Sequence, residues 1–139
     1  MDSDLQELDS DKLLQKYPLS LTEDSLITVP VGWQGIFLSL LDECEKYNKE
    51  HEEHIIILQA KEKFGEFYVY WDGPFEPARE IINNYTAQAD NICQFCGKSP
   101  AKVRTHRGWF ICLCDNCEEN YDRKRLEHSV WRGDNQGNL

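Results

Sequence analysis

The sequence has no apolar run that approaches the length of a membrane span, which argues against a transmembrane protein. It also lacks a secretory signal, because Met1–Asp4 is acidic where a signal peptide is basic and then apolar. Its 139 residues contain no internal repeat and no low-complexity tract. These absences predict a cytoplasmic protein with one compact domain, or with a small domain followed by a second module.

Basic residues are fewer than acidic ones. The chain has 15 lysines and arginines against 25 aspartates and glutamates, a net charge of −10. Residues 1–92 carry a net −12, whereas residues 93–139 carry a net +2. The acidic part disfavours broad nucleic-acid binding, which needs lysines and arginines to replace phosphate counterions. It suits a protein partner with a basic surface, or it serves solubility alone.

Four of the six cysteines form two C-x-x-C pairs, Cys93 with Cys96 and Cys114 with Cys117, with seventeen residues between the pairs. This is the spacing of a structural zinc site, in which four thiolates complete a tetrahedron at about 2.3 Å from the ion. Without a secretory signal, metal ligation is favoured over disulfides. A closed four-sulfur site leaves no coordination position for chemistry, so we predict one structural Zn²⁺ and no catalytic residue.

Two other residues compete as ligands. Cys112 lies two positions from Cys114, and side chains two apart share one face of a strand, so Cys112 is an alternative that only the C-x-x-C turn geometry disfavours. His106 can also replace a thiolate, although a histidine in a hairpin is more often solvated. Cys44, on an apolar helix face far from the others, is interpreted as a core residue.

The middle of the chain predicts an α-β-β-α unit. Apolar residues recur every three or four positions over residues 33–47, which is typical of one helix face. Two strand-like runs, residues 54–60 and 67–71, flank Gly65 and predict a hairpin. A second helix is predicted over residues 77–89.

We divide the chain into an acidic leader (residues 1–29), an α-β-β-α domain (30–90) and a zinc-binding module with a C-terminal helix (91–139). The leader is expected to contain one short helix that packs weakly. In the module, a C-x-x-C knuckle, a hairpin turning at Arg107-Gly108 and a helix beginning near Cys114 indicate a treble-clef-like ββα arrangement. The predicted fold class is therefore α+β.

Several basic and aromatic residues are candidates for partner binding, since such residues together can grip phosphates and stack on bases. The alternative interpretation of these residues is a solvated charged surface that binds no partner. The candidates are Lys61, Lys63, Phe64, Arg104, Arg107 and Trp109, with a further basic run at Arg123–Arg125. Phe64 at a hairpin tip is either an anchor for a partner or a plug against the zinc module.

A set of motifs also carries a resemblance to a known family. In order they are Gly32-Trp33, Leu40–Glu43, Lys61–Gly65, Cys93–Gly97 and Gly108-Trp109 ahead of Cys114. Over roughly residues 31–117 the chain resembles a family of small uncharacterised proteins of bacteriophages and prophages. The resemblance implies a mobile-element origin and residence in the bacterial host cytoplasm, but no activity. Where relatives commonly have a second glycine after Phe-Gly, this chain has Glu66.

We predict a non-enzymatic phage accessory protein that binds and modulates, for example inhibits, a host macromolecule such as a defence or nucleic-acid-processing protein. The acidic residues 1–92 can occupy a basic groove meant for nucleic acid. The alternative is a nucleic-acid-binding zinc protein that uses the basic and aromatic hairpin of the module. A metal-dependent nuclease would need His106 and His128 and a second divalent ion, and we expect no such activity.

Overall fold

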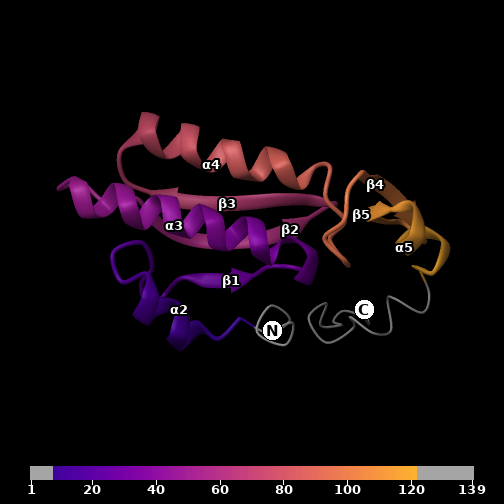
Figure 1. Ribbon diagram of the computed structural model, residues 1–139, viewed down its shortest axis with the longest axis horizontal. Helices are drawn as coiled ribbons and strands as arrows, with labels where there is room; N and C mark the ends of the chain where they lie inside the picture. The colour runs from indigo at the N-terminus through magenta and orange to yellow at the C-terminus, as the bar shows by residue number, and fades with distance from the viewer. Residues whose placement is uncertain (1–7, 122–139) are drawn as a thin grey trace.

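The computed structural model describes residues 8–121, which form a mixed α+β fold with two β-sheets (Figure 1). In chain order the elements are α2 (Ser10–Lys16), β1 (Leu26–Thr28), the 3₁₀ turn η1 (Val31–Trp33), α3 (Gln34–Glu50), β2 (Ile56–Lys63), β3 (Glu66–Asp72), α4 (Phe75–Ala89), β4 (Ala101–His106), β5 (Trp109–Cys114) and α5 (Asp115–Glu119). No helix in this range combines the length and the apolar character needed to cross a membrane. The helix expected beyond residue 121 and the basic run Arg123–Arg125 lie outside the described residues.

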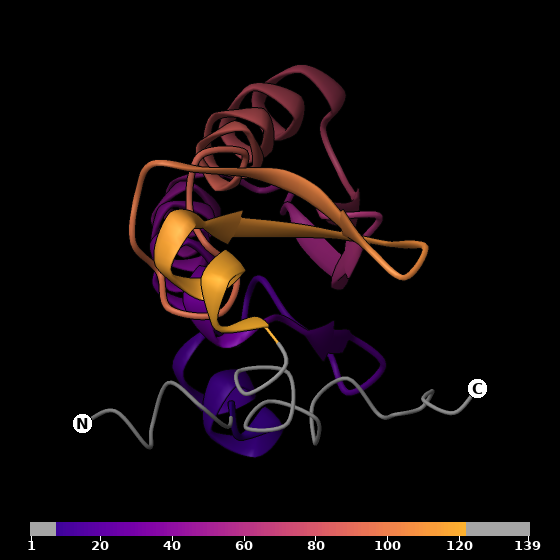
Figure 2. The same cartoon turned by 90° about the vertical axis from the view of Figure 1, so that its right-hand side faces the viewer.

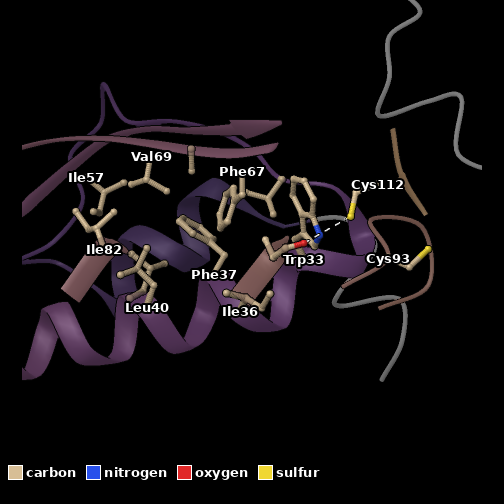
Figure 3. Close-up of a cluster of buried hydrophobic side chains, with 14 of the residues drawn as sticks. Trp33, Ile36, Phe37, Leu40, Ile57, Phe67, Val69, Ile82, Cys93 and Cys112 are labelled. Carbon is tan, nitrogen blue, oxygen red and sulfur yellow. Dashed lines mark hydrogen bonds between the residues drawn. The ribbon is translucent and has the colours of Figure 1, made fainter. Parts of the chain in front are cut away.

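The predicted order of helix, hairpin and helix is present as α3, β2, β3 and α4. The first sheet has the strand order β1-β2-β3, and α3 and α4 lie together over one of its faces (Figure 1). Apolar side chains of α3 such as Phe37 and Leu40 are fully buried against Phe67 and Val69 of β3, as Figure 3 shows. Burial of this stripe drives the layer packing, since each large apolar side chain contributes about 1.5–3 kcal/mol.

The β2–β3 hairpin turns at the position predicted from Gly65. Phe64 and Gly65 both have positive φ angles, 56° and 80°, as a two-residue hairpin turn of the right twist requires. The Gly65 N–H donates to the Glu62 carboxylate at 2.9 Å, which closes the turn. Strand alternation places Phe67 and Val69 toward the helices and Tyr68 and Tyr70 on the opposite face of the sheet.

The segment before residue 30 is more integrated than the sequence analysis expected. β1 joins the sheet as a parallel edge strand, with Leu26 opposite Gln59 of β2. Tyr17 is buried after the end of α2, and its hydroxyl donates to Asp42 of α3 at 2.6 Å. Burial, followed by that carboxylate, raises the pKa of Tyr17, so the hydroxyl stays a donor. The expectation of weak packing overlooked this polar anchor, which a count of apolar positions does not detect.

A buried polar cluster fastens the same segment to α3 and β2. The Asn48 side-chain amide donates to the Ser20 hydroxyl and to the Ile55 carbonyl, both at 3.0 Å, and its oxygen accepts from the Ile55 N–H at 2.8 Å. Ser20 in turn donates to the buried Glu45 carboxylate at 2.8 Å. Because buried polar groups are costly when unpaired, this set of mutual hydrogen bonds fixes where the segment runs.

The second sheet is the antiparallel hairpin of β4 and β5, which lies beyond one end of the first sheet (Figure 1) and so stands in front in the end-on view of Figure 2. It turns at Arg107-Gly108, as predicted, with φ angles of 53° and 85°. The Ile92 carbonyl ties the second sheet to the start of α3: it accepts from the Trp33 indole of η1 at 2.7 Å and from the Cys112 thiol of β5 at 3.4 Å. Figure 3 shows both of these side chains at the same end of the core.

Candidate metal centre

Cys93, Cys96, Cys114 and Cys117 converge in the structure. Their four sulfur atoms all lie within 4.8 Å of one another, and none of the six cysteines forms a disulfide. The sulfurs of Cys96 and Cys114 are 3.6 Å apart. A tetrahedral site with metal–sulfur bonds of about 2.3 Å places its sulfurs about 3.8 Å apart, so the spacing fits a metal ion. The four cysteines can therefore hold one metal.

The first pair is presented by a tight backbone turn after α4. The Gly97 N–H donates to the Cys93 carbonyl at 2.8 Å, and the Cys93 N–H donates to the Lys98 carbonyl at the same distance. Gly97 has a φ of 82°, which side chains other than glycine rarely allow. This is the knuckle predicted from Cys93–Gly97, and it points both sulfurs to one side of the turn.

The second pair stands at the junction of β5 and α5. Cys114 ends β5 and caps α5, and its sulfur accepts from the Cys117 N–H at 3.5 Å. Cys117 lies within α5 and is fully buried. The end of β5 and the first turn of α5 therefore place the sulfurs of Cys114 and Cys117 on the same side, facing the Cys93–Gly97 knuckle.

The electrostatics of the cluster also favour a cation. Burial raises the pKa of the Cys117 thiol, and charge on Cys93 and Cys96 raises it further. Burial acts in the same direction on Cys114, but the Cys117 N–H and the neighbouring thiols lower its pKa overall. Four sulfurs at this distance cannot all ionise without a compensating positive charge. A divalent cation supplies that charge and converts each thiol into a thiolate ligand.

The two competing ligands lie away from the cluster. The Cys112 sulfur points to the C-terminal end of α4, where it donates to carbonyls including that of Ile92. His106 stacks on Tyr121 at 3.9 Å between ring centroids, and its Nε2 lies 2.6 Å from the Glu118 carboxylate. Cys44 is buried in the core, as the sequence analysis interpreted it.

The candidate binding residues are distributed over two faces. Phe64 lies against Phe110 of β5, with ring centroids 6.3 Å apart, yet 63% of Phe64 remains exposed. Lys61 and Lys63 are on the same hairpin as Phe64. The structure thus brings the β2–β3 turn onto the second sheet, where Phe64 covers the module in part and is left accessible in part. Its role as an anchor for a partner stays a prediction.

Arg104 and Trp109 lie on the other face of the second sheet. The strand register places Arg104 beside Ile111 and pairs Trp109 with His106. Arg104 donates to the Leu113 carbonyl at 3.0 Å and to the Asp115 carboxylate at 2.8 Å, and its side chain is only 16% exposed. Its guanidinium holds the pKa of Asp115 below the usual range. Arg104 is therefore engaged within the module.

Arg107 occupies the turn of the second hairpin, next to Gly108. The predicted set of binding residues omits three aromatic residues on the side of Phe64, namely Phe110, Tyr68 and Tyr70. Strand alternation already placed the two tyrosines on the face away from the core, but nothing in the sequence indicated that Phe110 meets Phe64.

Comparison with known protein families, with curated proteins and with solved structures found no match to this chain.

Proposed function

We propose that this is a non-enzymatic binding protein that modulates a host macromolecule, with one structural zinc ion holding its binding surface in shape. The observation that carries this proposal is an exposed apolar surface where the two hairpins meet, formed by Phe64, Val103 and Phe110, which we call the two-hairpin surface. Exposed aromatic residues gathered in this way mark interaction sites more often than scattered ones do.

The two-hairpin surface is preformed rather than loose. A Cβ atom placed on Gly65 would lie 3.1 Å from both methyl groups of Val103, so the turn already rests closely on β4. Phe110 is 46% exposed and meets the edge of the Phe64 ring. A rigid surface loses little conformational entropy when a partner binds, which favours its use as a docking site.

Zinc is the metal that the donor set suits best. Four soft thiolates in a tetrahedron are typical of zinc or iron, and closed four-cysteine sites with two C-x-x-C pairs are typical of structural zinc. The succession of knuckle, hairpin and α5 supports a treble-clef-like module. The resemblance to phage and prophage proteins supports an accessory role in the bacterial cytoplasm.

The metal proposal predicts about one zinc per chain in protein purified without added metal. Inductively coupled plasma mass spectrometry of the purified protein measures this ratio directly. Visible absorption from an iron centre, or chains that contain four free thiols and no metal, would contradict the assignment.

The binding proposal predicts that the Phe64→Asn protein loses its host partner. Asparagine followed by Gly65 is the preferred pair for this turn, so the substitution removes the ring and keeps the hairpin. We expect the amount of partner recovered from bacterial host lysate to fall about tenfold or more, since aromatic anchors often contribute 2 kcal/mol or more. Recovery is measured by quantitative mass spectrometry of tagged protein, with and without nuclease.

Phe75→Ser is the matched control. Phe75 is 61% exposed, similar to Phe64, but it lies at the start of α4 beside Trp71 and Arg79. Equal partner recovery by wild type and Phe75→Ser, with loss in Phe64→Asn, supports the proposal. Equal recovery by all three proteins contradicts it.

A further inference from the structure

The face of the first sheet that α3 and α4 leave uncovered carries an alternating run of aromatic and basic side chains. Lys61 of β2 is paired in register with Tyr68 of β3, and Tyr70 follows on the same face of β3. Lys63 continues this face of β2 toward the turn. The helices cover the opposite face (Figure 1), so these side chains take no part in the core.

The run is continuous from the sheet to the two-hairpin surface. The rings of Tyr70 and Tyr68 are 6.4 Å apart and nearly parallel. The Lys61 ammonium lies 5.7 Å from the Tyr70 ring, and the Lys63 ammonium lies 5.8 Å from both Tyr68 and Phe64. Phe64 then meets Phe110 at 6.3 Å. We call these six residues the aromatic strip.

We propose that the aromatic strip binds single-stranded nucleic acid, with unpaired bases stacking on its rings and Lys61 and Lys63 contacting phosphates. This inference rests on the proposed function and names the chemistry of its partner. Neighbouring rings about 6 Å apart suit successive bases of an extended strand, because base stacking on aromatic side chains accepts any base. Bases in a duplex are already stacked on each other, so a duplex cannot use such a surface.

The charge distribution is complementary to this ligand in spite of the net charge of −10. Acidic side chains are concentrated in the helical layer on the other side of the sheet, where α3 alone has Asp42, Glu43, Glu45 and Glu50. Residues 93–114, which include the second hairpin, contain four lysines and arginines and no acidic residue. A polyanion is therefore repelled most strongly on the helical side, and the positive charge that it meets on the strip is that of Lys61 and Lys63.

Two acidic residues of β3 lie on the face of the strip, Glu66 beside Tyr68 and Asp72 beyond Tyr70. Glu66 is opposite Lys63 in the hairpin register, and its carboxylate accepts from the Tyr68 hydroxyl at 3.2 Å. That hydrogen bond raises the pKa of Tyr68 and keeps it a neutral ring. Glu66 offsets part of the lysine charge, so we expect affinity to come mainly from stacking and the salt dependence to be shallow.

The strip has a plain structural alternative. Lysines over aromatic rings stabilise paired strands at exposed sites without any ligand. The two explanations differ in a measurable way, since only a binding role makes the affinity for an oligonucleotide depend on these side chains.

The test is fluorescence anisotropy of labelled oligothymidylate and oligouridylate with the full-length, zinc-loaded protein. We expect Tyr70→Thr, which keeps β-propensity, to weaken binding about fivefold or more, as loss of one stacking ring does. Lys61→Gln with Lys63→Gln should reduce the slope of log affinity against log salt by about 1.4, for two lost phosphate contacts to a single strand. The control, Lys46→Gln with Lys49→Gln, removes the same charge from α3 and should leave the slope nearly unchanged.

The outcomes separate this inference from the proposed function. Oligonucleotide binding that depends on Tyr70 and the two strip lysines supports the inference, and tighter binding of one probe distinguishes DNA from RNA. No binding at low salt, or equal weakening by the α3 control, overturns it. If, in addition, Phe64→Asn still loses a nuclease-resistant protein from host lysate, the proposed function stands with a protein partner on the two-hairpin surface alone.

Discussion

Replacing Cys93 with serine is expected to remove the metal and unfold residues 91–121. Cys93 is fully buried and supplies one of the four clustered sulfurs. Structural zinc sites contribute about 10–16 kcal/mol of apparent binding free energy at neutral pH, which is folding free energy when no site exists in the unfolded chain. A five-residue helix and a two-stranded hairpin cannot replace that contribution by packing alone.

The loss should spread to the start of α3. The knuckle that contains Cys93 covers the start of α3, because the Gly32 N–H donates to the Gln94 carbonyl at 2.8 Å and Trp33 donates to Ile92. We therefore expect amide cross-peaks to broaden or collapse throughout the module and, in addition, at residues 30–37. A nitrogen-edited NMR spectrum combined with metal analysis of the same sample measures both effects.

Cys112→Ser is the matched control for this experiment. Cys112 is also buried and lies two residues from Cys114, but its sulfur points to the carbonyls of Ala89, Asp90 and Ile92 at and after the end of α4 rather than to the cluster. A serine hydroxyl can donate to the same carbonyls, so this variant should keep one metal per chain and a dispersed spectrum. If Cys112→Ser loses metal while Cys93→Ser retains it, the ligand assignment is wrong.

Replacing Gly32 with alanine is expected to destabilise the protein severely although only one methyl group is added. A Cβ atom at Gly32 would lie 1.9 Å from the Cys93 carbonyl oxygen and 2.7 Å from the Gly97 nitrogen. Both contacts are with backbone that the knuckle holds in place, so no side chain can rotate away. We expect the free energy of unfolding to fall by about 3 kcal/mol or more, at or beyond the top of the usual range for overpacking.

Gly35, three residues later, provides a control, because alanine there is expected to raise the free energy of unfolding rather than lower it. No atom lies within 4 Å of a Cβ placed there, and the residue is in the first turn of α3. Alanine at this helical position should stabilise the protein by about 0.5–1 kcal/mol. Urea unfolding of both variants tests the pair. A Gly32→Ala protein as stable as wild type would show that the knuckle does not rest on α3.

The features that the sequence predicted are those with a short repeat or a local signal. The apolar positions of α3, the turn residue Gly65 and the two C-x-x-C pairs are each visible within a window of about twenty residues. The structure confirms the helix, both hairpins and the close approach of the four cysteines. The metal and its treble-clef context remain predictions.

The features that the sequence did not predict depend on partners far away in the chain. β1 is three residues long and exists because β2 provides a parallel neighbour more than thirty residues later. Tyr17 is buried because Asp42 accepts its hydroxyl hydrogen bond. Phe64 and Phe110 form one surface because the second hairpin is held in place by the Cys112–Ile92 hydrogen bond and by the close approach of Val103 to Gly65. Periodicity within a segment contains no information about such pairings.

The contact between Gly32 and the Cys93–Gly97 knuckle also constrains the order in which the protein can fold. Trp33 finds its acceptor 59 residues downstream, so the beginning of α3 stays uncovered while the ribosome synthesises both central strands and α4. The N-terminal unit therefore cannot complete its core before residues 92–97 have been synthesised. If the four cysteines hold a metal, its supply should therefore affect the yield of the whole molecule, including parts far from the ion.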